Sequence, residues 1–314
     1  MHACSDRARP GGWGVDAATA DDFHHSLRVA LTGRTEAYDG AYQGSPDEWV
    51  ELFTHGWLYR GRSYAPWQQA RGGECRHLPP ERFVVFVSDH RHVERRRLGD
   101  RLHEGIGPEV YRAVSAVLTL SPYTPMLFMG QEWAAGAPFH YFADRAPEAG
   151  APVEPPEAVV RHALDTETNH VRADPAAEET FRAAKIKWSE GARAPHAGVG
   201  ALYQTCLRLR AGERIFQNPP RERWAVKRLG GAVALRWSDY DGGAWQLVLA
   251  LHPLGAVPWT HDVFTVPPAG QNWQVVLDTN ERRFGGPLKN RSVLDPAEEA
   301  CHFRSAGALL LHSV

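Results

Sequence analysis

The chain has 314 residues, with 35 lysines and arginines against 37 aspartates and glutamates and a net charge of −2. This balance gives no reason to expect nucleic acid or a membrane surface as a partner, and the length suffices for two domains with separate cores. No run approaches the roughly 18 apolar residues of a membrane-spanning helix, and the N-terminus carries no apolar signal region, so we expect a cytoplasmic protein.

The cysteines stand far apart, at Cys4, Cys75, Cys206 and Cys301. They form no CxxC pair, so their spacing fits reduced thiols and favours neither a disulfide framework nor a zinc site. We therefore expect no metal and no cofactor.

The first predicted helix opens with the run Asp21-Asp22-Phe23-His24-His25. Asp21 or Asp22 can cap it, and Thr32-Gly33 ends it. Taken alone, the two adjacent histidines indicate a capped helix with partly exposed side chains. They do not indicate a metal site, because metal ligands on a helix stand at i and i+4.

A second helix is predicted to start at Ser45-Pro46-Asp47-Glu48, which combines a cap, a proline and acids in the first turn. Residues 59–80 contain Gly, Pro, Arg and Tyr without a period and predict a long loop. Within that loop Tyr64, Trp67 and Arg71 could contact a sugar chain, or could simply pack the loop.

A buried strand is predicted at Phe83-Val84-Val85-Phe86-Val87, because the run is short, continuous and entirely β-branched or aromatic. A dense polar cluster, from Ser88 to Arg96, follows at once. A polar cluster at the carboxyl end of a buried strand is where α/β barrels carry their chemistry.

A second strand is predicted in the apolar run that starts at Pro125 and is followed by Gly130, Gln131 and Glu132. Between the two runs, residues 108–120 predict a helix, with Pro108 in the first turn and apolar residues recurring at helical spacing. Strand, helix and strand make the βαβ unit of a parallel sheet.

The pattern changes near residue 215. Before it, a last helix is predicted, with an apolar face made of Val199, Leu202, Tyr203, Cys206 and Leu207. After it, short apolar segments alternate with turns, and strands are predicted at 232–237, 245–251, 264–266, 273–277 and 308–311. Asp241-Gly242-Gly243 is a hairpin signal, so we expect an antiparallel β domain.

The two strand segments resemble the α-amylase family, and within it the malto-oligosyltrehalose trehalohydrolases. That family reads F-V-x-F-x-Q-N-H-D-Q-V-G-N-R, then G-[DE]-R-L, and later P-x-L-F-M-G-E-E-W. Ungapped matches to the first two patterns are Phe83, Val84, Phe86, His90, Val93, Arg96, Gly99, Asp100, Arg101 and Leu102. Matches to the third are Pro125, Leu127, Phe128, Met129, Gly130, Glu132 and Trp133. The D-D-F-H-H run and Lys185-Ile186-Lys187-Trp188-Ser189 also match the family.

The resemblance implies an α/β plus all-β architecture. Residues 1–214 would be the last third of a (β/α)8 barrel, and residues 215–314 a C-terminal antiparallel β-sandwich. The family hydrolyses the α-1,4 bond next to the terminal trehalose of maltooligosyl trehalose, so an α-glucan is the expected ligand. A partial barrel leaves two sheet edges unpaired, so we also expect an upstream barrel fragment or self-association as a partner.

The resemblance also assigns residues to the site. His90 matches the family's sugar-binding histidine, and the other residues expected to bind substrate are Asp22, His24, His25, Asp89, Arg96 and Glu132. No catalytic residue is assigned, because likeness to the family begins only after its nucleophile and its acid/base. The third family carboxylate, which stabilises the transition state, falls on Arg91, whose charge is opposite. Asp89 could replace it only from a different depth.

Three interpretations stay open at this point. The chain is a trehalohydrolase by descent that is truncated and inactive alone, or a non-catalytic relic or carbohydrate-binding fragment. The third is a sister activity such as a branching or debranching enzyme, which the D-D-F-H-H run and the stretch from Phe128 to Trp133 disfavour.

Overall fold

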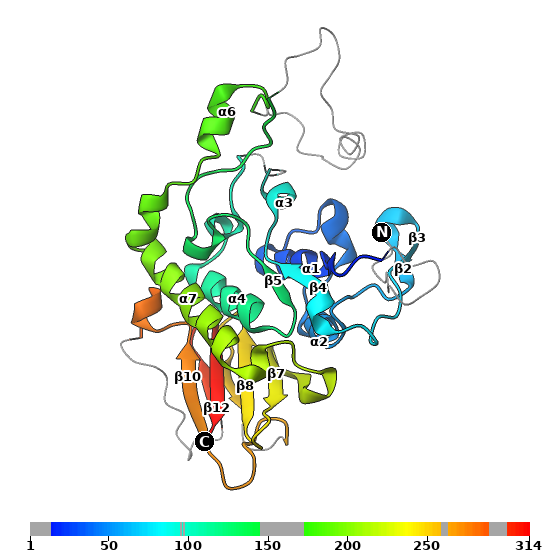
Figure 1. The fold of residues 1–314 in the computed structure, drawn as a ribbon, viewed down its shortest axis with the longest axis vertical. Helices are drawn as coiled ribbons and strands as arrows, with labels where there is room; N and C mark the ends of the chain where they lie inside the picture. The colour runs from blue at the N-terminus through cyan, green and yellow to red at the C-terminus, as the bar shows by residue number, and fades with distance from the viewer. Residues whose placement is uncertain (1–13, 95, 97, 145–172, 259–262, 289–299) are drawn as a thin grey trace.

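Three parallel strands form the sheet of the N-terminal half of the computed structural model, which describes residues 14–94, 96, 98–144, 173–258, 263–288 and 300–314. The strands are β1 (Ala18–Thr19), β4 (Phe83–Phe86) and β5 (Thr124–Met126), in the order β1-β4-β5. Ala18 pairs with Phe83, and Val84 pairs with Thr124. Figure 1 shows β4 and β5 beside helices α1 (Asp22–Thr32) and α2 (Pro46–His55).

The predicted βαβ unit is confirmed. Helix α4 (Pro108–Leu120) connects β4 to β5, and Pro108 stands in its first turn, as expected. The helix is buried on every side from Tyr111 to Leu120, more completely than an amphipathic pattern requires. The reason is its position, because it contacts helix α7 (His196–Gly212) and strands of the C-terminal sheet.

Both predicted helix starts near the N-terminus are confirmed, but one cap is not. Ser45 Oγ accepts a hydrogen bond from the Glu48 N–H at 3.3 Å, and Gly33 ends α1 in the left-handed conformation. Asp21 stands at the N-cap of α1 without a capping bond from its side chain. Its carboxylate accepts a hydrogen bond from Arg71 instead.

The predicted long loop at 59–80 is wrong in part, because it contains a hairpin of β2 (Arg62–Tyr64) and β3 (Gln69–Arg71). Strands of three residues are too short to show alternation in the sequence. Gly72, just after β3, has a φ of +72°, and a Cβ there would lie 1.8 Å from the Tyr59 carbonyl oxygen. Only glycine fits that position.

The C-terminal part is antiparallel, as predicted. Its main sheet has the order β10-β12-β8-β7-β6, and β9 pairs with β11 in a separate ribbon. The strands are β6 (Trp224–Leu229), β7 (Ala232–Ser238), β8 (Ala244–Ala250), β9 (Gly255–Pro258), β10 (Trp273–Asp278), β11 (Ala300–Phe303) and β12 (Gly307–Ser313). The turn at 241–243 joins β7 to β8, whereas the strand expected at 264–266 is not one.

Strand β8 is buried along its whole length because both faces of the main sheet are covered. One face packs against α4 in the larger apolar cluster, and the other forms a second cluster with Val257, Cys301 and Phe303 of the ribbon. The larger cluster runs through both halves of the chain. The boundary predicted between 214 and 215 stays a prediction, with α7 ending at Gly212 and β6 beginning at Trp224.

Three further expectations concern helix α7, the cysteines and membrane-spanning helices. Leu202, Tyr203 and Cys206 of α7 are buried, but Leu207 is exposed, so the predicted apolar face is one residue too wide. Cys75, Cys206 and Cys301 form no disulfide, and Cys4 lies outside the described residues. None of the described helices is long and apolar enough to cross a bilayer.

Arg112 joins α4 to the C-terminal sheet, and we expect its removal to destabilise the protein. Its guanidinium donates to the Thr279 carbonyl at 2.8 Å and to Asn280 Oδ1 at 3.0 Å, and the residue is 4% exposed. Arg112→Met keeps the apolar stem but leaves buried acceptors unpaired, which lowers the free energy of unfolding by about 2–4 kcal/mol. Urea titration followed by tryptophan fluorescence measures this change.

Arg228→Met is the matched control. Arg228 pairs with Asp47 at 2.7 Å, but the two side chains are 49% and 70% exposed. An exposed pair contributes about 0–1 kcal/mol. Equal losses in the two variants would show that Arg112 does not hold the two parts together.

Candidate functional site

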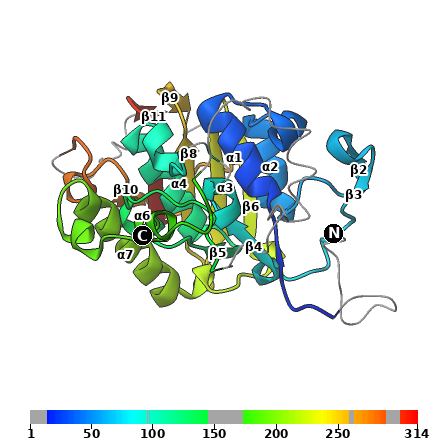
Figure 2. The ribbon, with the colours of Figure 1, turned by 90° about the horizontal axis from the view of Figure 1, so that it is seen from above.

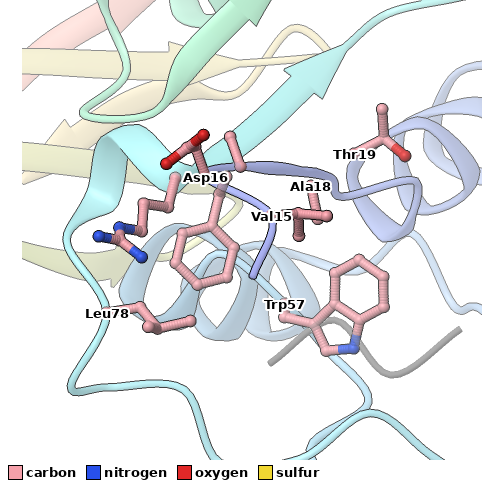
Figure 3. Close-up of a pocket in the computed structure, with 9 residues that line it drawn as sticks. Val15, Asp16, Ala18, Thr19, Trp57 and Leu78 are labelled. Atoms are coloured by element: carbon pink, nitrogen blue, oxygen red, sulfur yellow. The ribbon is translucent and has the colours of Figure 1, made fainter. Parts of the chain in front are cut away.

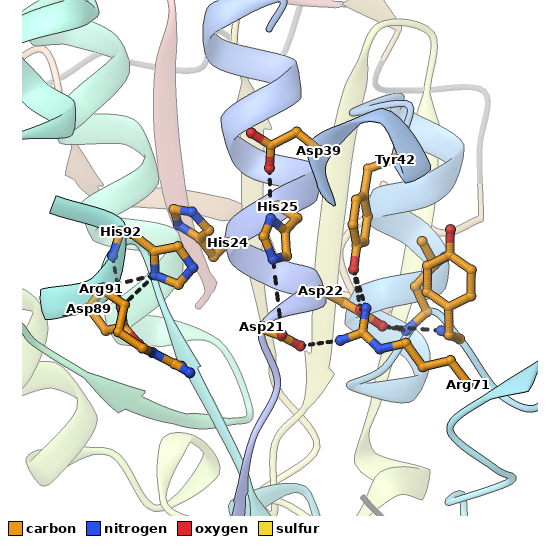
Figure 4. Close-up of polar contacts among 12 residues, drawn as sticks. Asp21, Asp22, His24, His25, Asp39, Tyr42, Arg71, Asp89, Arg91 and His92 are labelled. Carbon is orange, nitrogen blue, oxygen red and sulfur yellow. Dashed lines mark hydrogen bonds and ion pairs between the residues drawn. The ribbon is translucent and has the colours of Figure 1, made fainter. Parts of the chain in front are cut away.

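A row of charged side chains lies across the carboxyl ends of β1 and β4. The run that follows β1 places Asp21, Asp22, His24 and His25 at the start of α1, and the run that follows β4 places Asp89 before the short helix α3 (His90–Glu94). Figure 4 shows Arg71 at one end of this row and Arg91 at the other. We call this set the carboxyl-end row; its members are Asp21, Asp22, His24, His25, Arg71, Asp89 and Arg91.

Asp89 is held by two neighbours from its own segment. Its Oδ2 accepts bonds from Arg91 Nε at 2.9 Å and Nη2 at 2.8 Å, and its Oδ1 lies 2.6 Å from His92 Nδ1. Burial alone would raise the pKa of Asp89, but the hydrogen bonds from His92 and Arg91 and the charge of Arg91 hold that pKa well below its usual range. Both carboxylate oxygens are therefore occupied, and the group is ionised at working pH. This arrangement suits neither a proton donor nor an available nucleophile.

His24 joins α1 to β4. Its Nδ1 lies 2.5 Å from the Val87 carbonyl oxygen, which makes Nδ1 the protonated nitrogen. Its ring lies 3.6 Å from that of His92, centroid to centroid, and both residues are buried. Burial lowers the pKa of both imidazoles, and for His24 the nearby His92 adds to the effect. Both rings are consequently neutral near pH 7, and the buried Nε2 of His24 has no hydrogen-bond partner among the residues that the structure describes.

His25 and Asp39 continue the row toward β1. His25 Nδ1 lies 2.7 Å from Asp39 Oδ1, and Arg28 Nε lies 3.2 Å from the other Asp39 oxygen. The other ring nitrogen of His25 lies 4.0 Å from Asp21, and the ring stacks on Tyr42. These contacts fix the position of the His25 ring.

Asp22 is fully buried and has four partners. Its carboxylate accepts bonds from the Tyr42 hydroxyl at 2.6 Å and from the Leu58 and Tyr59 N–H groups at 2.7 and 3.1 Å. It also pairs with Arg71 Nη1 at 3.1 Å. Burial raises the pKa of Asp22, and the charge of Arg71 opposes that rise.

The remaining residues predicted to bind substrate are His90, Arg96 and Glu132. His90 is exposed at the start of α3 and open to a ligand. Arg96 pairs with Asp100 at 2.6 Å, and Glu132 is half-buried after β5. The roles of His90, Asp22, His24, His25, Asp89, Arg96 and Glu132 in substrate binding stay predictions. Asp22, His24 and Asp89 are 0–5% exposed, so they could reach a sugar only through a neighbour.

The sequence reasoning missed His92, Asp39 and Tyr42. His92 stands two residues after His90, and the ungapped family alignment drew attention to His90 alone. Asp39 and Tyr42 lie in a segment without a period, so only the folded chain shows their contacts.

A pocket lies at the other end of the same sheet. Figure 3 shows Val15, Asp16, Trp57 and Leu78 around it, beside the first residues of β1 and β4. Barrel enzymes carry their chemistry at the carboxyl ends of the strands, so this pocket is not the expected site. Among the described residues, no three His, Cys, Asp or Glu side chains are grouped to hold a metal ion.

Comparison with known proteins identifies the family. No protein-family model matches the chain. A malto-oligosyltrehalose trehalohydrolase of Deinococcus radiodurans is 34% identical over 259 residues, which are 81% of this chain. The enzyme of Arthrobacter ramosus is 34% identical over 252 residues, 77% of this chain. The chain is a homologue of the malto-oligosyltrehalose trehalohydrolases.

This trehalohydrolase homologue spans less than half the length of these relatives, 42% of the Deinococcus enzyme and 41% of the Arthrobacter enzyme. The matched part is their C-terminal part, as the motifs predicted.

Solved structures agree on the fold. A Salmonella typhimurium protein assigned as an α-amylase superposes with a TM-score of 0.74 at 24% identity, over 95% of this chain and 47% of that one. The pullulanase SAP of Group B Streptococcus gives a TM-score of 0.58 at 12% identity, over 98% of this chain and 41% of that one. These likenesses show an α-amylase-type fold, which confirms the predicted fold class at that level.

The buried histidines predict a loss of stability in mild acid. His24 is neutral in the folded protein, with its pKa well below the ordinary 6.5, so the unfolded chain binds the proton more readily. Stability is therefore full above pH 6.5 and declines as the pH falls below it. Between pH 7.5 and 5.5 such a histidine lowers the free energy of unfolding by up to about 1.4 kcal/mol. His55 and His103, with pKa values of about 4, add to the decline.

The variant His24→Gln measures how much His24 contributes to this decline in stability, because glutamine can still donate a hydrogen bond to the Val87 carbonyl. Urea titration at pH 7.5 and 5.5 should show a smaller decline in this variant than in the wild type. The exposed His302 supplies the control as His302→Gln, whose decline should equal that of the wild type. An unchanged decline in His24→Gln would contradict the assignment.

Proposed function

We propose that residues 1–214 form the last third of a (β/α)8 barrel and supply one wall of an α-glucan site, with residues 215–314 as the C-terminal β domain. The ligand is maltooligosyl trehalose, and the reaction is hydrolysis of the α-1,4 bond next to its terminal trehalose. The observation that carries this proposal is the 34% identity to the Deinococcus trehalohydrolase over 81% of the chain. The charged row at the strand ends supports it, because it lies where barrel enzymes carry their sites.

The chain alone is inactive under this proposal. A retaining glycosidase needs a nucleophile and an acid/base about 5 Å apart, and the resemblance assigns neither to a residue of this sequence. Arg91 stands at the position of the family's third carboxylate. The carboxylate oxygens of the nearby Asp89 are occupied by Arg91 and His92. Hydrolysis therefore needs the remaining strands and their carboxylates from another barrel segment, which would also pair the edge strands β1 and β5.

A carbohydrate-binding role without catalysis is the second candidate. The ion pair of Arg91 and Asp89 favours it, because the pair occupies the carboxylate that precedes α3 while His90 stays exposed.

Trehalose release from maltooligosyl trehalose separates these possibilities. We expect none from the purified chain alone. Release after mixing with a separately produced barrel fragment of an active relative would support a split enzyme. Release by the chain alone would overturn the proposal, and Asp89 and Glu132 would then be the first residues to mutate. No release in either case, together with binding of maltooligosaccharide, would favour the second candidate.

Arg91→Asp should not create activity in the chain alone. The variant restores the charge of the family's third carboxylate, but it supplies neither nucleophile nor acid/base. It also removes the partner of Asp89 and places a second carboxylate beside it, which raises the pKa of Asp89. The same trehalose assay tests this, and clear hydrolysis by Arg91→Asp alone would refute the account of the absent carboxylates.

A further inference from the structure

The hairpin β2–β3 presents one tryptophan at its tip. Trp67 is 39% exposed, whereas Tyr64 and Arg71, the other two residues expected to contact a sugar, are 1% and 4% exposed. The chain turns tightly here, with Gln68 in the left-handed conformation at a φ of +51°. Of the three candidates from the sequence, the structure therefore leaves only Trp67 open to a ligand.

A stack of aromatic rings holds Trp67 in place. Tyr42, Tyr59, Tyr64 and Trp67 follow one another edge to face, with centroid separations of 5.7, 4.8 and 5.1 Å. The first three rings are buried, so the exposed ring is the last member of a rigid series. A ring fixed in this way loses little conformational freedom when a ligand covers it.

Arg71 fastens the same rings to the carboxyl-end row. Its guanidinium donates to Asp21 and to the Tyr42 hydroxyl, and it pairs with Asp22 at 3.1 Å. It also lies 4.6 Å from the Tyr64 ring and 5.2 Å from the Trp67 ring. Trp67 thus stands at the β1 end of the row, and His90 stands at its β4 end.

The surroundings of Trp67 favour a neutral ligand. The charge of Arg71 is balanced by two aspartates, and the two residues that follow Trp67 in the chain, Gln68 and Gln69, carry exposed neutral amides. An indole face with neutral donors and acceptors beside it matches a pyranose ring, which has an apolar C–H face and a rim of hydroxyls.

We infer that Trp67 is a stacking platform for a glucose unit of an α-1,4-glucan chain that lies along the carboxyl-end row. The inference rests on the proposed function and adds to it the residue that fixes one end of the ligand. Arg71 contacts no sugar and acts as a positioning residue for the ring.

Calorimetric titration of the full 314-residue chain with maltoheptaose tests this assignment. Trp67→Ala should weaken binding about tenfold, the scale of losing one aromatic contact face, and Trp67→Phe should retain most of the affinity. Saturating maltoheptaose should change the tryptophan fluorescence of the wild type, and this change should be smaller in Trp67→Ala. Equal melting temperatures would show that the variants are folded.

Trp188→Ala is the matched control. Trp188 is 74% exposed, lies outside the hairpin, and its loss should leave the affinity unchanged. If Trp67→Ala binds maltoheptaose as the wild type does, or if Trp188→Ala weakens binding equally, the platform is refuted while the proposed function stands. If the wild type binds no maltoheptaose at all, the proposed glucan site fails and the platform fails with it.

Discussion

The burial of charge at the strand ends is the constraint on which this half of the molecule depends. Asp22 has no exposed surface, and a buried carboxylate is tolerated only when it is paired and hydrogen-bonded. Arg71 supplies the charge, while Tyr42 and two backbone N–H groups supply hydrogen bonds. These partners come from three separate segments, so satisfying one carboxylate fixes the segment after α1, the turn after α2 and the hairpin at once. The hairpin has strands of only three residues, so its own backbone hydrogen bonds are few. The contacts of Arg71 therefore account for its stable conformation.

Helix α4 has the corresponding role between the two sheets. It connects two strands of the parallel sheet, and its other side lies against β8 and β12 of the antiparallel sheet. Ser115 and Thr119 are buried within the helix, and each hydroxyl donates to a backbone carbonyl one turn earlier, at 2.7 and 2.8 Å. These two hydroxyl residues can therefore occupy a buried stretch of the helix, because their hydrogen bonds stay within the helix. The consequence is a shared core, in which loosening the C-terminal sheet also loosens the support of β4 and of the row above it.

Sequence patterns predicted the parts of the fold in which one short segment decides its own structure. The strand at 83–87, the helix from Pro108 to Leu120 and the hairpin turn at 241–243 are of this kind, because periodicity, a proline at the first turn and a glycine pair act locally. The family motifs also pointed to the carboxyl end of β4, where the charged row lies. The partners within the site were not predictable in the same way. That His92 rather than His90 would contact Asp89 depends on where α3 turns, and that Arg71 would meet Asp21 depends on a contact fifty residues away along the chain.

The arginine at position 91 is compatible with this architecture because of its neighbour. An arginine in place of a carboxylate would leave an uncompensated charge at the strand ends if nothing paired with it, but Asp89 accepts two of its N–H groups on one oxygen. The same pairing favours the ionised state of Asp89, whose other oxygen contacts His92, and the His92 ring lies beside that of His24. A single charge reversal has thus become part of a packed network that reaches from β4 to α1. At this position Arg91 balances the charge of Asp89 within the chain. At the two ends of the row, His90 and Trp67 have exposed side chains.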